Sequence, residues 1–202
     1  METESIGHVH FTLGDAARLS YDHIKRRRGR AAINIASIAL GLSFYATLVL
    51  SDTFYGTYEG LGGGQLSVES YQYWLMAVAL VVSVVGITNA MLIAVYERYR
   101  EIGTMKCLGA LDRHIIMLFL VESGFQGLAG GTLGFIFGTL AAVATTGFTT
   151  GFDILFKVPA IRMITLFGGS VLLALILSMV ATMYPAWRAS KLRPVEALRY
   201  EL

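Results

Sequence analysis

The side chains best suited to chemistry are few, and they form no complete catalytic set. Glu122 and Ser123 place a carboxylate beside a hydroxyl, but no histidine lies within the long apolar segments to act as the base that a serine nucleophile needs. Cys107 and His114 are seven residues apart and do not supply the three or four ligands of a stable metal site. We therefore expect no enzyme activity and no metal site in this chain.

A nucleotide site of the common kind is also missing from the sequence. The pattern G-x-x-x-x-G-K-[ST], whose backbone N–H groups cradle phosphates, does not occur. We expect the chain to bind no cofactor by itself.

Long apolar segments dominate the elements that would position these residues. Hydrophobic residues make up 55% of the chain, and four segments contain no Asp, Glu, Lys or Arg: Ala31 to Ser51, Tyr71 to Tyr96, Ser123 to Phe152 and Met163 to Trp187. A helix needs only about 20 apolar residues to cross a bilayer. The sequence predicts an all-α integral membrane protein, a single domain over 1–202, with four transmembrane helices at 31–51, 71–96, 115–146 and 163–187.

The distribution of positive charge predicts the orientation of these helices. Fourteen of the sixteen basic residues precede the first apolar segment, lie between the second and third, or follow the fourth, and only Lys157 and Arg162 lie elsewhere. Because Lys and Arg collect in short cytoplasmic loops, both termini and the central loop are expected in the cytosol. The predicted location is the cell (cytoplasmic) membrane.

The connecting segments are short. Residues 12–30 have the pattern of an amphipathic helix in the membrane interface. Residues 52–70 are Gly-rich and residues 147–162 are rich in Phe, so both are expected to form short external loops. Pro185 is expected to end or bend the last helix, and residues 188–202 would form a cytosolic tail.

Residues 97–114 form a charged, helix-prone loop between two apolar segments. The loop offers polar side chains such as Arg100 and Glu101 and apolar ones such as Met105 and Leu108. This mixture is typical of a helix that docks against a cytosolic protein, and also of an amphipathic helix that merely lies on the membrane surface.

Glycines recur at close spacing in the third apolar segment. They generate overlapping small-xxx-small patterns, which let helix backbones approach closely in lipid. We expect them to pack against another helix, from the same subunit or from another copy: Gly127, Gly130, Gly131, Gly134 and Gly138.

Three polar residues lie in or beside apolar segments. Glu122 is about 10 Å into the third helix counted from Ile115, so it is either a polar coupling point or one half of a structural pair with Arg, Lys or Gln126. Asn34 and Asn89 are expected to form hydrogen bonds between helices.

Three stretches carry a resemblance to a known family. They are Gly86 to Ala110, which contains Glu97-Arg-Tyr-Arg-Glu-Ile-Gly-Thr-Met-Lys-Cys-Leu-Gly-Ala110, then Phe119-Leu-Val-Glu-Ser123, and Pro185-Ala-Trp-Arg-Ala-Ser-Lys-Leu-Arg-Pro-Val-Glu-Ala-Leu-Arg-Tyr-Glu201. They resemble the FtsX-like permease family, the membrane subunits of MacB-type and lipoprotein-releasing ABC transporters. The resemblance covers the second to fourth apolar segments and the tail.

The resemblance implies a dimer of four-helix subunits, formed by two copies or with a related permease, in which each subunit engages an ABC ATPase on a separate chain that binds ATP and Mg. It also implies that residues 97–114 hold a coupling helix. The residues expected to contact the ATPase are Glu97, Arg98, Arg100, Glu101, Ile102, Gly103, Met105, Lys106, Leu108 and Gly109. Such permeases carry a large extracytoplasmic domain where this chain has only residues 52–70.

The expected function is therefore that of a non-catalytic permease subunit. It would couple ATP hydrolysis to export or extraction of a hydrophobic or amphiphilic substrate, or transmit force across the membrane with a separate extracytoplasmic partner. The alternative is a non-transporting scaffold or sensor that docks an ATPase or a regulator. Nothing in the sequence suggests a nucleic-acid partner.

Overall fold

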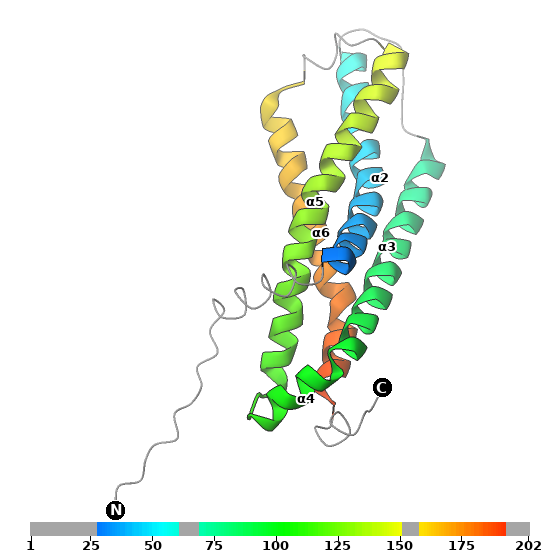
Figure 1. Ribbon diagram of the computed structural model, residues 1–202. Helices are drawn as coiled ribbons and strands as arrows, with labels where there is room; N and C mark the ends of the chain where they lie inside the picture. The colour runs from blue at the N-terminus through cyan, green and yellow to red at the C-terminus, as the bar shows by residue number, and fades with distance from the viewer. Residues whose placement is uncertain (1–27, 61–68, 151–157, 193–202) are drawn as a thin grey trace, which may run out of the picture.

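A computed structural model of the chain describes residues 28–60, 69–150 and 158–192, and every element in these ranges is a helix (Figure 1). Four helices are long and apolar enough to cross a membrane, and one is short. The elements are α2 (Arg28–Gly60), α3 (Ser70–Glu97), α4 (Tyr99–Cys107), α5 (Asp112–Thr150) and α6 (Ala160–Ser190). For these described ranges, the prediction of an all-helical fold with four long apolar helices is confirmed.

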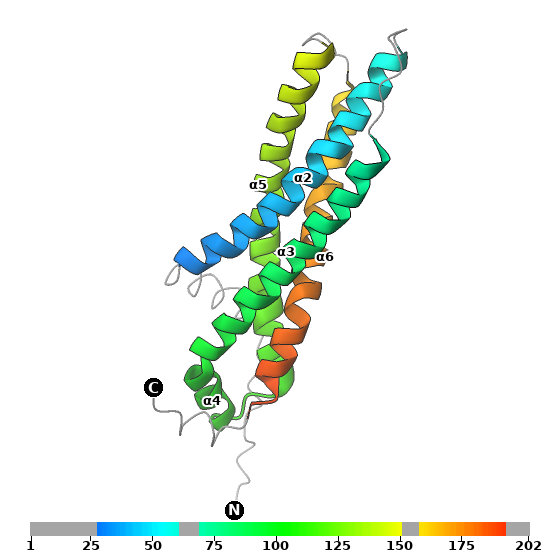
Figure 2. The ribbon, with the colours of Figure 1, turned by 90° about the vertical axis from the view of Figure 1, so that its right-hand side faces the viewer.

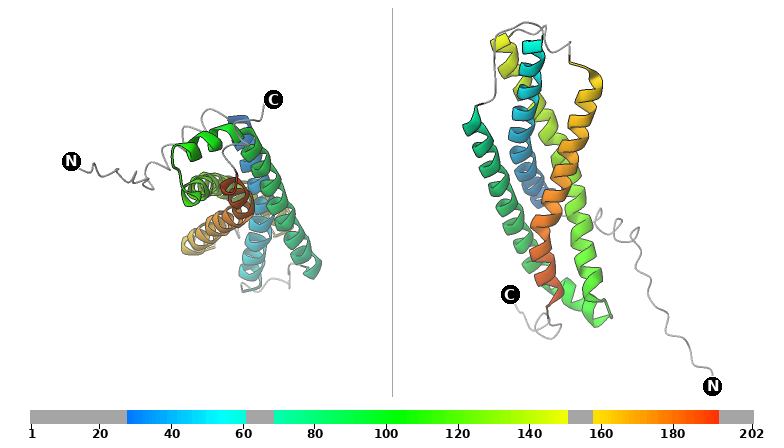
Figure 3. Two further views of the ribbon diagram at one scale, coloured as in Figure 1. Left: turned by 90° about the horizontal axis from the view of Figure 1, so that it is seen from below. Right: turned by 180° about the vertical axis from the view of Figure 1, so that it is seen from behind.

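The long helices form one bundle in which α5 is central. Helix α5 makes its main contacts with α2 and α6, while α3 packs against α2 and α6. Helices α2 and α3 lie side by side and cross α5 and α6 at an angle (Figure 2). Seen from below, α4 lies across one end of the bundle, where α3 and α6 end and α5 begins (Figure 3). We call this the α4 end.

Buried side chains form three clusters along the bundle. At the α4 end, Val95, Ile102, Ile115 and Phe119 pack with two alanines of α6. The middle cluster joins α2, α3 and α6, and the third joins α2 and α5 at the opposite end. Each of the four long helices therefore contributes buried apolar side chains to at least two of these three clusters or their edges.

Helix α2 is longer than the sequence predicts. It continues to Gly60, so the prediction of a loop from residue 52 is wrong for residues 52–60. Phe54 is fully buried and packs against Ala142 of α5, which holds this last part of α2 on the bundle. Helical order here comes from burial that the Gly-rich composition does not reveal.

Helix α6 does not end at Pro185 but runs on to Ser190. A proline inside a helix leaves the carbonyl four residues earlier without its N–H donor. Here that carbonyl belongs to Ala181, and the hydroxyl of Thr88 on α3 donates a hydrogen bond to it at 3.0 Å. The lost backbone bond is thus replaced across the α3–α6 contact, as membrane helices require.

The glycines of α5 bring its backbone close to two helices of the same chain. A Cβ added at Gly130, Gly134 or Gly138 would lie within 3 Å of atoms of α2, and one at Gly127 or Gly131 would lie within 3 Å of atoms of α6. The neighbours of this glycine pattern are therefore α2 and α6.

Substitution at one of these contacts should destabilise the bundle. A Cβ at Gly138 would lie 2.7 Å from the backbone oxygen of Ser43, so Gly138→Ala should cost about 1–3 kcal/mol of unfolding free energy. A Cβ at Gly169 of α6 meets nothing within 4 Å, so Gly169→Ala should be neutral or stabilise by up to about 1 kcal/mol. Unfolding curves in mixed detergent with increasing SDS would compare the two, and equal stability would contradict the packing described.

Some predicted features lie wholly or partly outside the described residues. These are the interfacial helix up to residue 27, the loop residues 61–68 and 151–157, and the tail from residue 193. The predicted loop 147–162 is wrong at both of its described ends, because α5 continues to Thr150 and α6 already begins at Ala160.

Candidate functional site at the α4 end

The joint between α3 and α4 is the single residue Arg98. Its backbone N–H donates to the carbonyls of Ala94 and Val95, both at 3.2 Å, so it closes α3. Its carbonyl accepts the N–H of Ile102 at 2.9 Å, so it also opens α4. With φ −100° and ψ 15° the chain turns here without losing either set of hydrogen bonds.

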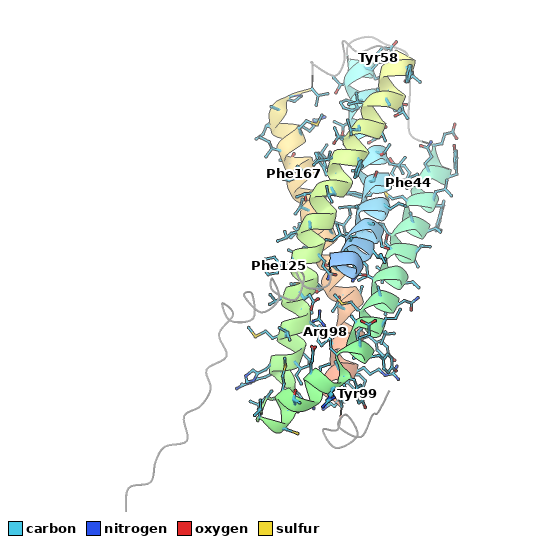
Figure 4. The ribbon with its side chains drawn as sticks, in the orientation of Figure 1. Phe44, Tyr58, Arg98, Tyr99, Phe125 and Phe167 are labelled. Carbon is cyan, nitrogen blue, oxygen red and sulfur yellow. The ribbon has the colours of Figure 1, made fainter. Side chains whose placement is uncertain are left out.

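The side chain of Arg98 points into the bundle (Figure 4). There it binds the carboxylate of Glu122 on α5. The two guanidinium NH₂ nitrogens donate to the two carboxylate oxygens at 2.8 and 3.0 Å, and both side chains are only 7% exposed. Such bidentate, charge-assisted pairs are the most directional contacts available to side chains. Arg98 also sits at the C-terminus of α3, where a positive charge is favoured.

Two further contacts hold α4 on the bundle. In the middle of α4, Ile102 is buried against Ile115 and Phe119 of α5. At its end, Lys106 pairs with Asp112 at 2.9 Å and donates to the carbonyl of Ser190, the last residue of α6. Helix α4 is therefore attached at its beginning, middle and end, to both α5 and α6.

The turn after α4 presents Leu108 to the outside. The N–H of Gly109 donates to Lys106 O and the N–H of Ala110 donates to Met105 O, each at 3.0 Å, which is the Schellman arrangement of a helix C-terminus. It requires a left-handed residue, and Gly109 has φ +95°. Leu108 directly before it is 87% exposed.

The outward side of this end is a mixed polar and apolar surface. We use the name α4 surface for six exposed residues at this end: Arg100, Glu101, Thr104, Cys107, Leu108 and Leu111. Exposed leucines together with exposed charged residues are the composition of a protein contact.

The ten residues predicted to contact an ATPase separate into two sets. Glu97, Arg100, Glu101, Leu108 and Gly109 are exposed, and Met105 and Lys106 are half-buried. Arg98, Ile102 and Gly103 are buried and face the bundle, so they are not available to a docking protein. The alternation follows from helical periodicity, which places every third or fourth residue of α4 on the bundle.

The polar residues of the apolar segments have different surroundings. Glu122 pairs with Arg98, and Gln126 instead accepts a hydrogen bond from the amide of Asn34 at 3.1 Å, which links α2 to α5. Asn89 lies on the exposed side of α3 and makes no side-chain hydrogen bond among the described residues, so the bond between helices predicted for it is not present within this part of the chain. Sequence reasoning missed Gln126 as the partner of Asn34.

Metal ligands do not gather anywhere in the described ranges. No group of three or more His, Cys, Asp or Glu side chains could hold an ion there.

Comparison with known proteins agrees with the family resemblance of the sequence. The family model described as FtsX-like permease C-terminal matches residues 73–194, more than half of the chain. The macrolide export ATP-binding/permease protein MacB of Bdellovibrio bacteriovorus is 41% identical over 130 residues, which are 63% of this chain and 18% of that protein.

Two ABC transporter permeases are also similar. One from Methanocaldococcus jannaschii is 36% identical over 125 residues, covering 62% of this chain and 31% of that protein. One from Bacillus subtilis is 29% identical over 201 residues, covering 100% of this chain and 44% of that protein. The chain spans less than half the length of these curated relatives.

Proposed function

The chain belongs to the FtsX-like permease family of ABC transporter permeases, and we propose that it passes force from a separate ABC ATPase into its four-helix bundle. The observation that carries the proposal is the attachment of α4, which is bonded to the bundle on one side and exposed on the other. ATP and Mg²⁺ are bound by the ATPase, and this chain binds no cofactor.

The proposed orientation places the α4 end in the cytosol of a cytoplasmic membrane. Of the described basic side chains, six lie at that end and Arg162 lies at the opposite one. The six are Arg98, Arg100, Lys106, Arg113, Arg188 and Lys191. Positive residues favour the cytoplasmic side, so both termini would be cytosolic.

The substrate of this permease is proposed to be hydrophobic or amphiphilic. Among the described residues, the only buried charged side chains are those of Arg98 and Glu122. These two charges neutralise each other. No row of charges is therefore available for an ion path in the described residues. Three activities are compatible with a bundle of this composition: export of the substrate, its extraction from the membrane, or force transmission to a separate extracytoplasmic partner.

The lone cysteine of the chain allows a direct test of ATPase docking. Cys107 is exposed at the end of α4 and is the only cysteine in the sequence. A benzophenone maleimide attached there in native membranes should crosslink to an ABC-type ATPase upon illumination.

The matched control moves the label to the opposite end of the bundle. A Cys107→Ser, Phe148→Cys variant carries the crosslinker at an exposed position of α5 far from α4. It should yield no ATPase. Crosslinking of the ATPase from Phe148→Cys but not from Cys107 would contradict the proposed docking surface.

We further propose that the exposed side of α3 contacts a second permease, either another copy or a related chain. Asn89 lies on that side, in a stripe that includes Val82, Val85 and Ile93. An amide that faces lipid is costly, whereas one that meets another amide across a helix pair is satisfied.

Asn89→Leu should therefore weaken the association of two permease subunits. Polar contacts between membrane helices are worth about 0.6–2 kcal/mol, so the dissociation constant should rise by about 3–30-fold. Single-molecule photobleaching at several protein-to-lipid ratios would measure it, with Val85→Leu as the control on the same side of α3. An unchanged dissociation constant for Asn89→Leu would assign the contact to another helix.

A further inference from the structure

We propose that the Arg98–Glu122 pair is the element that makes α4 and α5 move together. The inference rests on the proposed function, because it takes α4 as the helix on which the ATPase acts. Arg98 and Glu122 are positioning residues in this proposal, since neither touches the ATPase or the substrate.

Arg98 connects three helices through three different groups. Its backbone N–H donates to carbonyls of α3, its backbone carbonyl accepts an N–H of α4, and its side chain is bound to Glu122 of α5. One residue between two helices is otherwise a natural hinge, because rotation about its φ and ψ angles would swing α4 away from the bundle. The side-chain pair opposes that rotation at the pivot itself.

The geometry of the pair suits this task better than a single contact would. The planar guanidinium donates two parallel hydrogen bonds to the carboxylate, which fixes direction as well as distance. Glu122 lies about 15 Å along α5 from Asp112. A displacement of α4 is therefore delivered to α5 within the bundle and not only at its end.

If the Arg98–Glu122 pair served only the stability of the fold, its replacement by apolar side chains would have a different effect. Replacing a buried ion pair by apolar side chains of similar volume is often neutral or stabilising, whereas removing one partner leaves an uncompensated charge. The double variant Arg98→Met, Glu122→Met should therefore fold and insert while it lacks the directional bond. If the pair is only structural, this variant should behave like the parent chain.

Double electron–electron resonance, which measures the distance between two spin labels, can show how firmly α4 is held. One spin label is placed on the native Cys107 of α4 and the other on Leu133→Cys, an exposed position about 30 Å further along α5 from Asp112. The labelled chain is diluted with unlabelled chain in lipid nanodiscs. The parent should give a narrow distance distribution, and the double variant one at least about twofold broader.

Two further variants keep the test decisive. Arg98→Lys retains the charge but loses the two-pronged bond, so its distribution should also broaden, and it serves if the double variant does not fold. Glu59→Met removes an exposed carboxylate at the far end of α2 and should leave the width unchanged. Equal widths in the parent, the double variant and Arg98→Lys would overturn the inference.

The ATPase complex adds a readout of coupling. In the parent complex, ATP with Mg²⁺ should leave the distance between Cys107 and position 133 unchanged, because α4 and α5 move together. In the double variant the ATPase should still bind and hydrolyse ATP, but the distance should change with nucleotide. A change of the same size in the parent would also overturn the inference.

The proposal and the underlying function fail in different ways. If no ATPase binds the parent chain, the proposed function fails, while the nanodisc distances still decide whether the pair holds α4. If the ATPase binds and the nanodisc widths are equal, the function stands and the role of the pair is refuted.

Discussion

Glu122→Leu alone is expected to lower the unfolding free energy by about 3–5 kcal/mol, the largest effect of any single substitution considered for this chain. The change leaves the buried guanidinium of Arg98 without its carboxylate partner. Equilibrium unfolding in mixed detergent with increasing SDS would measure the loss. Part of the protein should already fail to insert or should aggregate during purification.

A matched substitution separates loss of the pair from loss of a carboxylate. Glu59→Leu makes the same change at an exposed residue near the end of α2, and its effect should stay within about 0.5 kcal/mol. The double variant Arg98→Met, Glu122→Met should recover most of the stability lost in Glu122→Leu. A Glu122→Leu chain as stable as Glu59→Leu would show that the buried pair is dispensable for the fold.

Leu108→Asp is expected to weaken ATPase docking by about tenfold or more, the second large effect. Leu108 is 87% exposed and is held outward by the turn at Gly109, so it is the most prominent apolar group of the α4 surface. Burial of a leucine in a partner contributes about 1.5–3 kcal/mol, and a buried carboxylate would oppose docking further. Titration of the ATPase onto nanodiscs that contain the permease would give the dissociation constant.

Phe148→Asp is the control for this substitution. Phe148 is equally exposed, at 87%, but lies near the end of α5 away from α4. The variant should dock the ATPase as the parent does. If Leu108→Asp docks equally well, the partner contacts other residues of the α4 surface or another part of the chain.

Much of this architecture could be predicted because its signals are long and local. Four segments without charge predict four long helices, and the charged stretch between the second and third contains α4. The glycines of α5 predict close approach of a helix. They could not show that Gly138 meets α2 while Gly131 meets α6, because a spacing pattern identifies a face and not its neighbour.

The remaining features depend on partners that are distant in sequence. From the sequence, Arg98 is predicted to be one of several charged residues that contact the ATPase. Only the position of α5 in the fold shows that Arg98 pairs with Glu122 instead. Pro185 predicts the end of a helix unless Thr88 supplies the missing donor. The helical extension of α2 beyond Ser51 depends on the burial of Phe54 by α5. In each case packing overrides a local preference of the sequence.

The measurement that tests the central claim most directly is affinity purification of the tagged chain from its native membrane in mild detergent, followed by mass spectrometry of the bound proteins. The permease account predicts an ABC-type ATPase in equal amount, and its loss from the Leu108→Asp variant but not from Phe148→Asp. Recovery of the chain alone, or with partners that include no ATPase, would contradict the account and favour a membrane scaffold.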